Sequence, residues 1–231
     1  MLPFTVCPVG DTGLLVSFEQ RIAQSVGAAV AALNTRVAAA AISGVVETVP
    51  AFASLLIFYD PLVTEYDAVA VAVQKLAQVP DSDTAAEEGR LVEIPVCYGG
   101  TFGPDLPFVA EHAGLTEKEV IELHTGREYR IYMLGFLPGF PYLGGLDERL
   151  FTPRLASPRT AIPAGSVGIG GEQTGVYPIA SPGGWQLIGR TPLKLFDPSA
   201  GRLPYTAGDR IRFCPITQDE FDAIAQKEGT V

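Results

Sequence analysis

The chain has 231 residues, of which 47% are hydrophobic and 18% charged, and its formal net charge is −10. This composition is typical of a globular protein long enough for one large domain or two small ones. Because no run of Lys or Arg offsets the negative charge, neither nucleic acid nor a membrane is an expected partner. The apolar content instead favours an interface with another protein.

The three cysteines, Cys7, Cys97 and Cys214, are odd in number and far apart. They form neither a CxxC metal pair nor an even disulfide framework, so a reducing cytoplasm is the expected location. The N-terminus does not read as a secretion signal. An alanine-rich stretch at residues 26–42 is interrupted by the tripeptide NTR, and it falls short of the ~20 apolar residues of a membrane span.

Residues 1–80 predict a small α+β domain. Apolar residues at steps of three and four indicate helices, and short β-rich segments bounded by Gly, Pro and Asp indicate strands. The expected elements are strands at 4–9 and 14–18, a helix at 21–41, strands at 45–49 and 54–59, and a helix at 66–76. This order, β-β-α-β-β-α, is typical of helices on one face of a mainly antiparallel sheet.

A polar segment without apolar periodicity, residues 81–90, is predicted to link this domain to a second one at 91–231. Most of the second domain shows short strands between Gly and Pro turns, which is typical of a β-barrel or sandwich. Thr116 and Glu119 form a capping-box pattern at the start of one short helix. The expected elements are strands at 91–97 and 129–136, helices at 104–113 and 116–124, short strands up to residue 213, and a helix at 217–226.

The stretch from residue 134 to residue 198 gathers glycines, prolines, aromatics and cations in an otherwise acidic chain. Between residues 151 and 196 the cations are Arg154, Arg159, Arg190 and Lys194, against a single acid. A guanidinium group binds carboxylate or phosphate through two parallel hydrogen bonds, so the arginines are candidates for binding an anion, although a lone arginine usually serves solubility. Prolines and glycines would hold the surrounding loops in fixed, bent conformations.

Further side chains of this stretch suit a small polar ligand. Gln173, Gln186 and Tyr177 could orient it through hydrogen bonds. Aromatic side chains could form the walls around it, although core packing is their more common role. The aromatic candidates are Phe136, Phe140, Tyr142 and Trp185.

Only two histidines are present, and His124 is the more informative. It ends a predicted helix, where the helix C-terminus favours the cationic form, and it is a candidate either for moving protons or for capping the helix. His112 is expected on a helix surface. No GxSxG elbow and no clustered metal ligands accompany them, so neither triad nor metal chemistry is expected. GIGGEQ at 168–173 lacks the third glycine of a dinucleotide turn and no P-loop exists, so any ATP would require another chain or other parts.

Three long motifs carry a family resemblance: GFLPGFPYLGGL (135–146), PRLASPRTAIPAGSVGIGGEQTGVYP (153–178) and SPGGWQLIGRTPLKLFDP (181–198). With PVGD at 8–11 and VPAFASL at 49–55, they resemble the allophanate hydrolase subunit 1 family over nearly the whole chain. The resemblance implies a small α+β domain followed by a cyclophilin-like β-barrel. It also implies a component of an ATP-dependent 5-oxoprolinase, which opens 5-oxo-L-proline to L-glutamate together with its A and C subunits.

On this basis a lactam or amide is the expected ligand, with His124 and Arg190 as catalytic candidates. The expected substrate-binding residues are Arg154, Arg159, Gln173, Tyr177, Trp185, Gln186, Phe140 and Tyr142, with no metal ligand. The family leaves two alternatives open. One is a regulatory protein that binds and inhibits a sensor histidine kinase, with Phe136, Phe140 and Trp185 as anchors. The other is a subunit in urea or allophanate metabolism.

Overall fold

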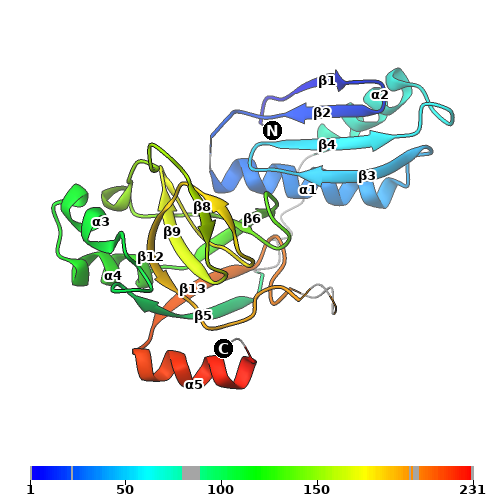
Figure 1. Cartoon of the computed structure of the whole chain (residues 1–231). Coiled ribbons are helices and arrows are strands. Elements are labelled where there is room, and N and C mark those ends of the chain that lie inside the picture. The colour runs from blue at the N-terminus through cyan, green and yellow to red at the C-terminus, as the bar shows by residue number, and fades with distance from the viewer. Residues whose placement is uncertain (1, 22, 80–88, 198, 200–202, 230–231) are drawn as a thin grey trace. The chain divides into compact units, whose positions relative to one another are not determined.

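The computed structural model describes residues 2–21, 23–79, 89–197, 199 and 203–229 (Figure 1). Contacts divide the chain into two compact units, residues 1–87 and 88–231. Each unit has a hydrophobic core of its own. The greater part of the predicted linker, residues 81–88, lies outside the described residues. No described helix is both long enough and apolar enough to cross a membrane.

The first unit is a four-stranded antiparallel sheet with the strand order β1-β2-β4-β3, combined with two helices. The elements are β1 (Thr5–Val9), β2 (Gly13–Ser17), α1 (Gln24–Ala40), β3 (Val45–Pro50), β4 (Ser54–Tyr59) and α2 (Tyr66–Ala77). The predicted order of strands and helices is therefore observed. Helix α1 begins three residues later than predicted, because Ala23 before it has an extended backbone.

Buried apolar residues alternate with more exposed residues along the central strands, and the buried ones form the core of this unit. Leu14 and Val16 on β2, and Leu55 and Ile57 on β4, have no exposed side-chain surface. Helix α1 covers them with apolar residues spaced by three and four positions, as the sequence pattern predicts. These residues are Val26, Val30, Leu33 and Val37.

The second unit is built on a seven-stranded sheet with the order β10-β9-β12-β5-β13-β6-β7. Its end strands, β7 and β10, pack against each other, so the sheet curls into a nearly closed barrel (Figure 1). Strands β8 and β11 form a separate ribbon. The strands are β5 (Leu91–Tyr98), β6 (Tyr129–Leu134), β7 (Pro141–Gly144), β8 (Arg159–Ile162), β9 (Ser166–Gly170), β10 (Gln173–Val176), β11 (Ser181–Gly183), β12 (Gln186–Arg190) and β13 (Arg210–Pro215). The helices are α3 (Leu106–Ala113), α4 (Glu117–Thr125), a 3-10 turn at Glu148–Leu150 and α5 (Gln218–Glu228).

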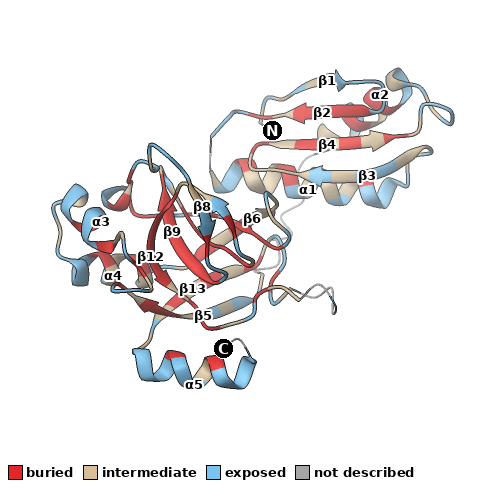
Figure 2. Ribbon diagram, in the orientation of Figure 1, coloured by how far each residue is buried: buried red, intermediate tan, exposed pale blue. Residues whose placement is uncertain are grey.

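Apolar side chains fill the interior of the barrel, and strands β9 and β12 are buried along almost their whole length (Figure 2). The interior residues include Ile94, Val96, Ile131, Val167, Ile169, Ile188, Ile211 and Phe213. Strand β13 pairs in parallel with β5 and antiparallel with β6, which ties the C-terminal part of the unit to its start. The mainly β character predicted for this part of the chain is therefore confirmed.

Two predicted boundaries are wrong for reasons that concern the pocket described below. Strand β6 ends at Leu134 rather than at Phe136, because residues 135–140 form a loop with its own hydrogen bonds. Helix α3 begins at Leu106 rather than at Pro104. Asp105, just before it, makes no cap hydrogen bond because its carboxylate binds other partners. The capping box of α4 is present as predicted.

Candidate functional site

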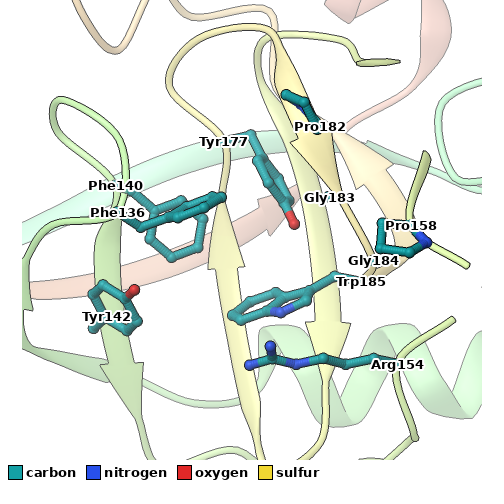
Figure 3. Close-up of a pocket in the computed structure, with 10 residues that line it drawn as sticks. All are labelled: Phe136, Phe140, Tyr142, Arg154, Pro158, Tyr177, Pro182, Gly183, Gly184 and Trp185. Atoms are coloured by element: carbon teal, nitrogen blue, oxygen red, sulfur yellow. The ribbon is translucent and has the colours of Figure 1, made fainter. Parts of the chain in front are cut away.

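A pocket of about 290 Å³ opens at the surface of the second unit (Figure 3). The loop between β6 and β7, the segment before β8 and the region around β11 supply its walls. The lining residues are Phe136, Phe140, Tyr142, Arg154, Pro158, Tyr177, Pro182, Gly183, Gly184 and Trp185. Most of them belong to the stretch that the sequence singled out for its glycines, prolines and aromatics.

Phe140 is the centre of the aromatic wall. Its ring makes edge-to-face contacts with Tyr142 and Tyr177 at 5.3 Å between ring centroids, and with Phe136 and Trp185 at 5.6 Å. Phe140 is only 2% exposed, so it belongs to the core as well as to the pocket. Such perpendicular packing fixes each ring through its neighbours, which gives the wall a defined shape.

Two glycines leave the space in which these rings lie. A Cβ atom on Gly170 of β9 would lie 2.4 Å from Cδ1 of Trp185. A Cβ atom on Gly175 of β10 would lie 3.0 Å from Phe140 and 3.1 Å from Trp185. The indole therefore lies directly on the strand backbone, and any larger residue at position 170 would displace it.

The three candidate arginines have different partners in the structure. Arg154 lines the pocket, is exposed, and places its guanidinium 5.8 Å from the centroid of the Trp185 ring. Among the described residues it forms no ion pair. Arg159 is bound to Asp105 at 2.7 Å, and Arg190 donates from Nε to the carbonyl of Ala164 at 2.9 Å. Only Arg154 is therefore positioned to meet a ligand in this pocket.

Asp105 connects the start of α3 to the segment that carries the indole. One carboxylate oxygen accepts from Arg159 at 2.7 Å, and the other accepts from the backbone N–H of Leu187 at 2.6 Å. Arg159 also donates to the carbonyl of Trp185 at 3.3 Å. The Asp105–Arg159 pair thus holds the backbone on both sides of residue 186 and positions the Trp185 ring without lining the pocket.

The two glutamines differ in position. Gln186 is 3% exposed and donates from Nε2 to the carbonyl of Pro153 at 2.9 Å, so it fixes the segment that carries Arg154. Gln173 lies half-buried at the start of β10 and does not line the pocket. Neither amide is among the groups that a ligand in the pocket would meet first.

Tyr177 presents a neutral hydroxyl to the pocket. Burial raises its pKa to about 12, against opposing effects of Arg154, Arg159 and a hydrogen bond with the Trp185 backbone. The phenol therefore keeps its proton over the physiological pH range and can donate a hydrogen bond to a ligand carbonyl.

His124 lies in the barrel interior and is not a lining residue. It is fully buried, its ring stacks on Phe213 at 4.7 Å, and burial lowers its pKa to about 3. The Nδ1 atom lies 2.8 Å from the Tyr98 hydroxyl and the Nε2 atom 2.7 Å from Oγ1 of Thr174. Because the Thr174 hydroxyl donates to the carbonyl of Gly168, Nε2 carries the proton and Nδ1 accepts from Tyr98.

The remaining groups with chemical potential lie elsewhere. His112 is exposed on α3, as predicted, and stacks on Phe108. Cys7, Cys97 and Cys214 are free thiols. Within the described ranges, no three His, Cys, Asp or Glu side chains gather as metal ligands.

Five of the eight predicted substrate-binding residues therefore meet in one pocket, whereas Arg159, Gln173 and Gln186 do not line it. The predicted catalytic candidates, His124 and Arg190, also lie outside the lining set. Pro158, Pro182, Gly183 and Gly184 also line the pocket, but they were not among the predicted substrate-binding residues. Their signal was the motif SPGG beside the single tryptophan.

The fold of this chain is shared with part of a urea carboxylase. The structure of urea carboxylase from Kluyveromyces lactis superposes with a TM-score of 0.81 over 98% of this chain and 23% of that chain, at 21% identity. A model of the family "Carboxyltransferase domain, subdomain C and D" matches residues 4–205, and the chain belongs to that family.

Two bacterial proteins that carry the same functional name are similar to this chain in sequence. A protein of Bacillus subtilis (strain 168), named as the B subunit of 5-oxoprolinase, is 44% identical over 235 residues, which cover 96% of each chain. A protein of the same name from Escherichia coli O157:H7 is 55% identical over 160 residues, covering 68% of this chain and 69% of the relative. The resemblance inferred from the three motifs is thereby confirmed.

Proposed function

We propose that this protein is the B subunit of an ATP-dependent 5-oxoprolinase, which hydrolyses 5-oxo-L-proline to L-glutamate together with its A and C subunits. The name shared by its relatives supports a role in that complex. The observation that carries the proposal for this chain is the aromatic pocket with the Arg154 guanidinium at its edge.

The chemistry of the pocket matches a small ring with one negative charge. At about 290 Å³ the pocket is at the lower end of the ~300–1,000 Å³ of typical ligand sites, which suits a compact molecule. 5-Oxo-L-proline is a five-membered lactam with a carboxylate. Its ring would pack against Phe140 and Trp185, its carboxylate would accept from Arg154, and the Tyr177 hydroxyl would donate to the lactam carbonyl.

These contacts assign binding and orientation to this chain. Holding the carboxylate and the ring fixes the direction of the lactam carbonyl, which is the group that must react. The aromatic wall also excludes water from one side of the ring. We expect ATP to bind another subunit, because the sequence contains neither a P-loop nor a complete dinucleotide turn.

Some finer expectations accompany this function. We propose that the barrel-like sheet is a cyclophilin-like barrel and that the two units are separate domains linked at residues 81–90. We also propose a cytoplasmic location. Limited proteolysis followed by mass mapping tests the linker directly, because cleavage inside residues 81–90 should release two fragments that remain folded.

Reconstitution with candidate A and C subunits tests the function. The complex should form L-glutamate from 5-oxo-L-proline only when ATP is present, and Arg154→Gln should raise KM about 10- to 100-fold through loss of a charge-assisted hydrogen bond. Lys118→Gln, on the exposed surface of α4, is the charge-matched control. Wild-type KM in Arg154→Gln, or a larger defect in Arg190→Gln, would reject this site.

A kinase inhibitor is the second candidate, and one observation favours it. Phe136 at the edge of the pocket is 63% exposed, and an exposed aromatic is a common anchor in protein interfaces. Under this alternative the pocket would accept a side chain of a histidine kinase. Tight binding to a kinase domain, with no oxoprolinase activity in any combination of subunits, would favour it.

A further inference from the structure

Phe136 has a backbone conformation that large residues rarely adopt. Its φ is +60°, and the N–H of Leu137 donates to the carbonyl of Gly135 at 2.6 Å across it. Such a three-residue turn with positive φ is strained, and a bulky side chain makes it more costly. Among the described non-glycine residues, only Ala41 shares the positive φ.

The loop around Phe136 is held from both sides. Gly135 donates its N–H to the carbonyl of Phe140 at 3.1 Å, and Phe140 donates to Leu137 at 3.0 Å. The fully buried Tyr205 donates its hydroxyl to the carbonyl of Gly139 at 2.9 Å. These bonds fix the turn against the barrel, so the strain at residue 136 cannot relax by a simple movement of the loop.

The side chain of Phe136 contributes little to the stability of the fold. It is 63% exposed, and its aromatic partner is Phe140, at 5.6 Å with perpendicular rings. Yet it lines the pocket, beside Phe140 in Figure 3. A residue that costs backbone strain and buries little surface is explained by a ligand rather than by folding.

We propose that Phe136 determines specificity for a cyclic ligand, because its ring forms the outer wall that packs against one face of the bound ring. The inner wall, Phe140 and Trp185, is buried and cannot adapt, whereas Phe136 supplies apolar contact only when a ring lies beside it. The choice of a five-membered lactam as that ring rests on the proposed function. A ligand with the same carboxylate and amide but no ring would gain little from Phe136.

The test compares a ring with its open-chain analogue. Trp185 is the single tryptophan and lines the pocket, so its fluorescence reports binding to the full-length chain directly. In Phe136→Gly the Kd for 5-oxo-L-proline should rise roughly 3- to 10-fold, while the Kd for N-acetyl-L-alanine changes less than about 2-fold. Phe136→Tyr keeps the ring and should bind 5-oxo-L-proline as the wild type does.

Measurements of Tm distinguish a role of Phe136 in ligand binding from a role in stabilising the fold. Because glycine relieves the strain at positive φ, Phe136→Gly should unfold at the wild-type Tm or up to ~4 °C above it. Ala41→Gly, at the C-terminal end of α1, relieves the same kind of strain and is the matched control. It should raise Tm similarly and leave both Kd values unchanged.

Several outcomes would overturn the inference. Phe136→Gly could bind the ring as tightly as the wild type, or lose affinity equally for both compounds. It could also keep its affinity but fail to co-purify with the partner subunits, which would make Phe136 a docking anchor. If the wild-type chain and complex bind no ring compound, both proposals fail. If 5-oxo-L-proline binds without ATP-dependent glutamate formation, the proposed function alone fails, and the Kd ratios still decide the role of Phe136.

Discussion

The buried histidine makes a quantitative prediction about acid stability. Folding lowers the pKa of His124 from its ordinary 6.5 to about 3, through burial. Below pH 6.5 the unfolded chain therefore binds a proton that the folded chain cannot hold, and folding stability falls by about 1.4 kcal/mol per pH unit. Between pH 6.5 and pH 4.5 the loss from His124 is about 2 kcal/mol, and it continues until the pH approaches 3. Its phenolic neighbours Tyr98 and Tyr129 stay neutral there, because burial raises their pKa values.

Urea denaturation at a series of pH values, read through Trp185 fluorescence, measures this loss in the unit that contains His124. His124→Gln removes the titrating group and keeps a donor and an acceptor for Thr174 and Tyr98. It should be less stable at pH 7.5 but should lose about 2 kcal/mol less on going from pH 6.5 to 4.5. His112→Gln, at the exposed histidine of α3, should follow the wild-type profile. Parallel profiles for the wild type and His124→Gln would refute the reasoning.

Two further predictions concern the support of the pocket. Gly170→Ala should displace the Trp185 ring and cost about 1–3 kcal/mol of stability, with a shift of the emission maximum, because its Cβ would lie 2.4 Å from the indole. Gly184→Ala, with its nearest contact at 3.7 Å, is the control, and equal Tm losses in the two variants would contradict the packing argument. Asp105→Asn should weaken the bonds to Arg159 and the Leu187 N–H, at about 1–3 kcal/mol by urea denaturation, and should raise KM in the complex. An unchanged KM in a destabilised Asp105→Asn would make its role purely structural.

Local patterns predicted the elements of the first unit well. The strand expected at residues 54–59 is β4 without change, because its alternation of buried and partly buried residues is complete within six positions. The boundaries of helices and strands were predicted wrongly where residues from distant parts of the chain contact the residues at the boundary. Asp105 lies next to α3 in the sequence, yet its carboxylate accepts hydrogen bonds from Arg159 and from the N–H of Leu187, which come much later in the chain. The parallel pairing of β5 with β13 likewise joins segments that share no local signal.

In the candidate site, too, local sequence patterns predicted some features, whereas others depend on contacts between distant residues. The aromatic wall was predictable, because Phe140, Tyr142 and Trp185 stand in an unusual run of glycines and prolines. The three arginines could not be ranked, since the sequence does not show that Arg159 meets Asp105 while Arg154 forms no ion pair with the described residues. For His124, local pattern predicted a helix end, but only the fold shows that its ring enters the barrel and stacks on Phe213.

The pocket is equipped for binding more than for proton transfer. Among the described residues that line it, there is no carboxylate, histidine or cysteine, and the Tyr177 hydroxyl keeps its proton up to a pKa of about 12. If the proposed hydrolysis uses a base that activates water near neutral pH, that base comes from another subunit or from outside the pocket. If so, Tyr177→Phe and His124→Gln should leave the shape of the kcat pH profile of the reconstituted complex unchanged, while Tyr177→Phe raises KM. A shifted acidic limb in His124→Gln, within the pH range where both complexes stay folded, would instead show that protons reach the reaction through the barrel interior.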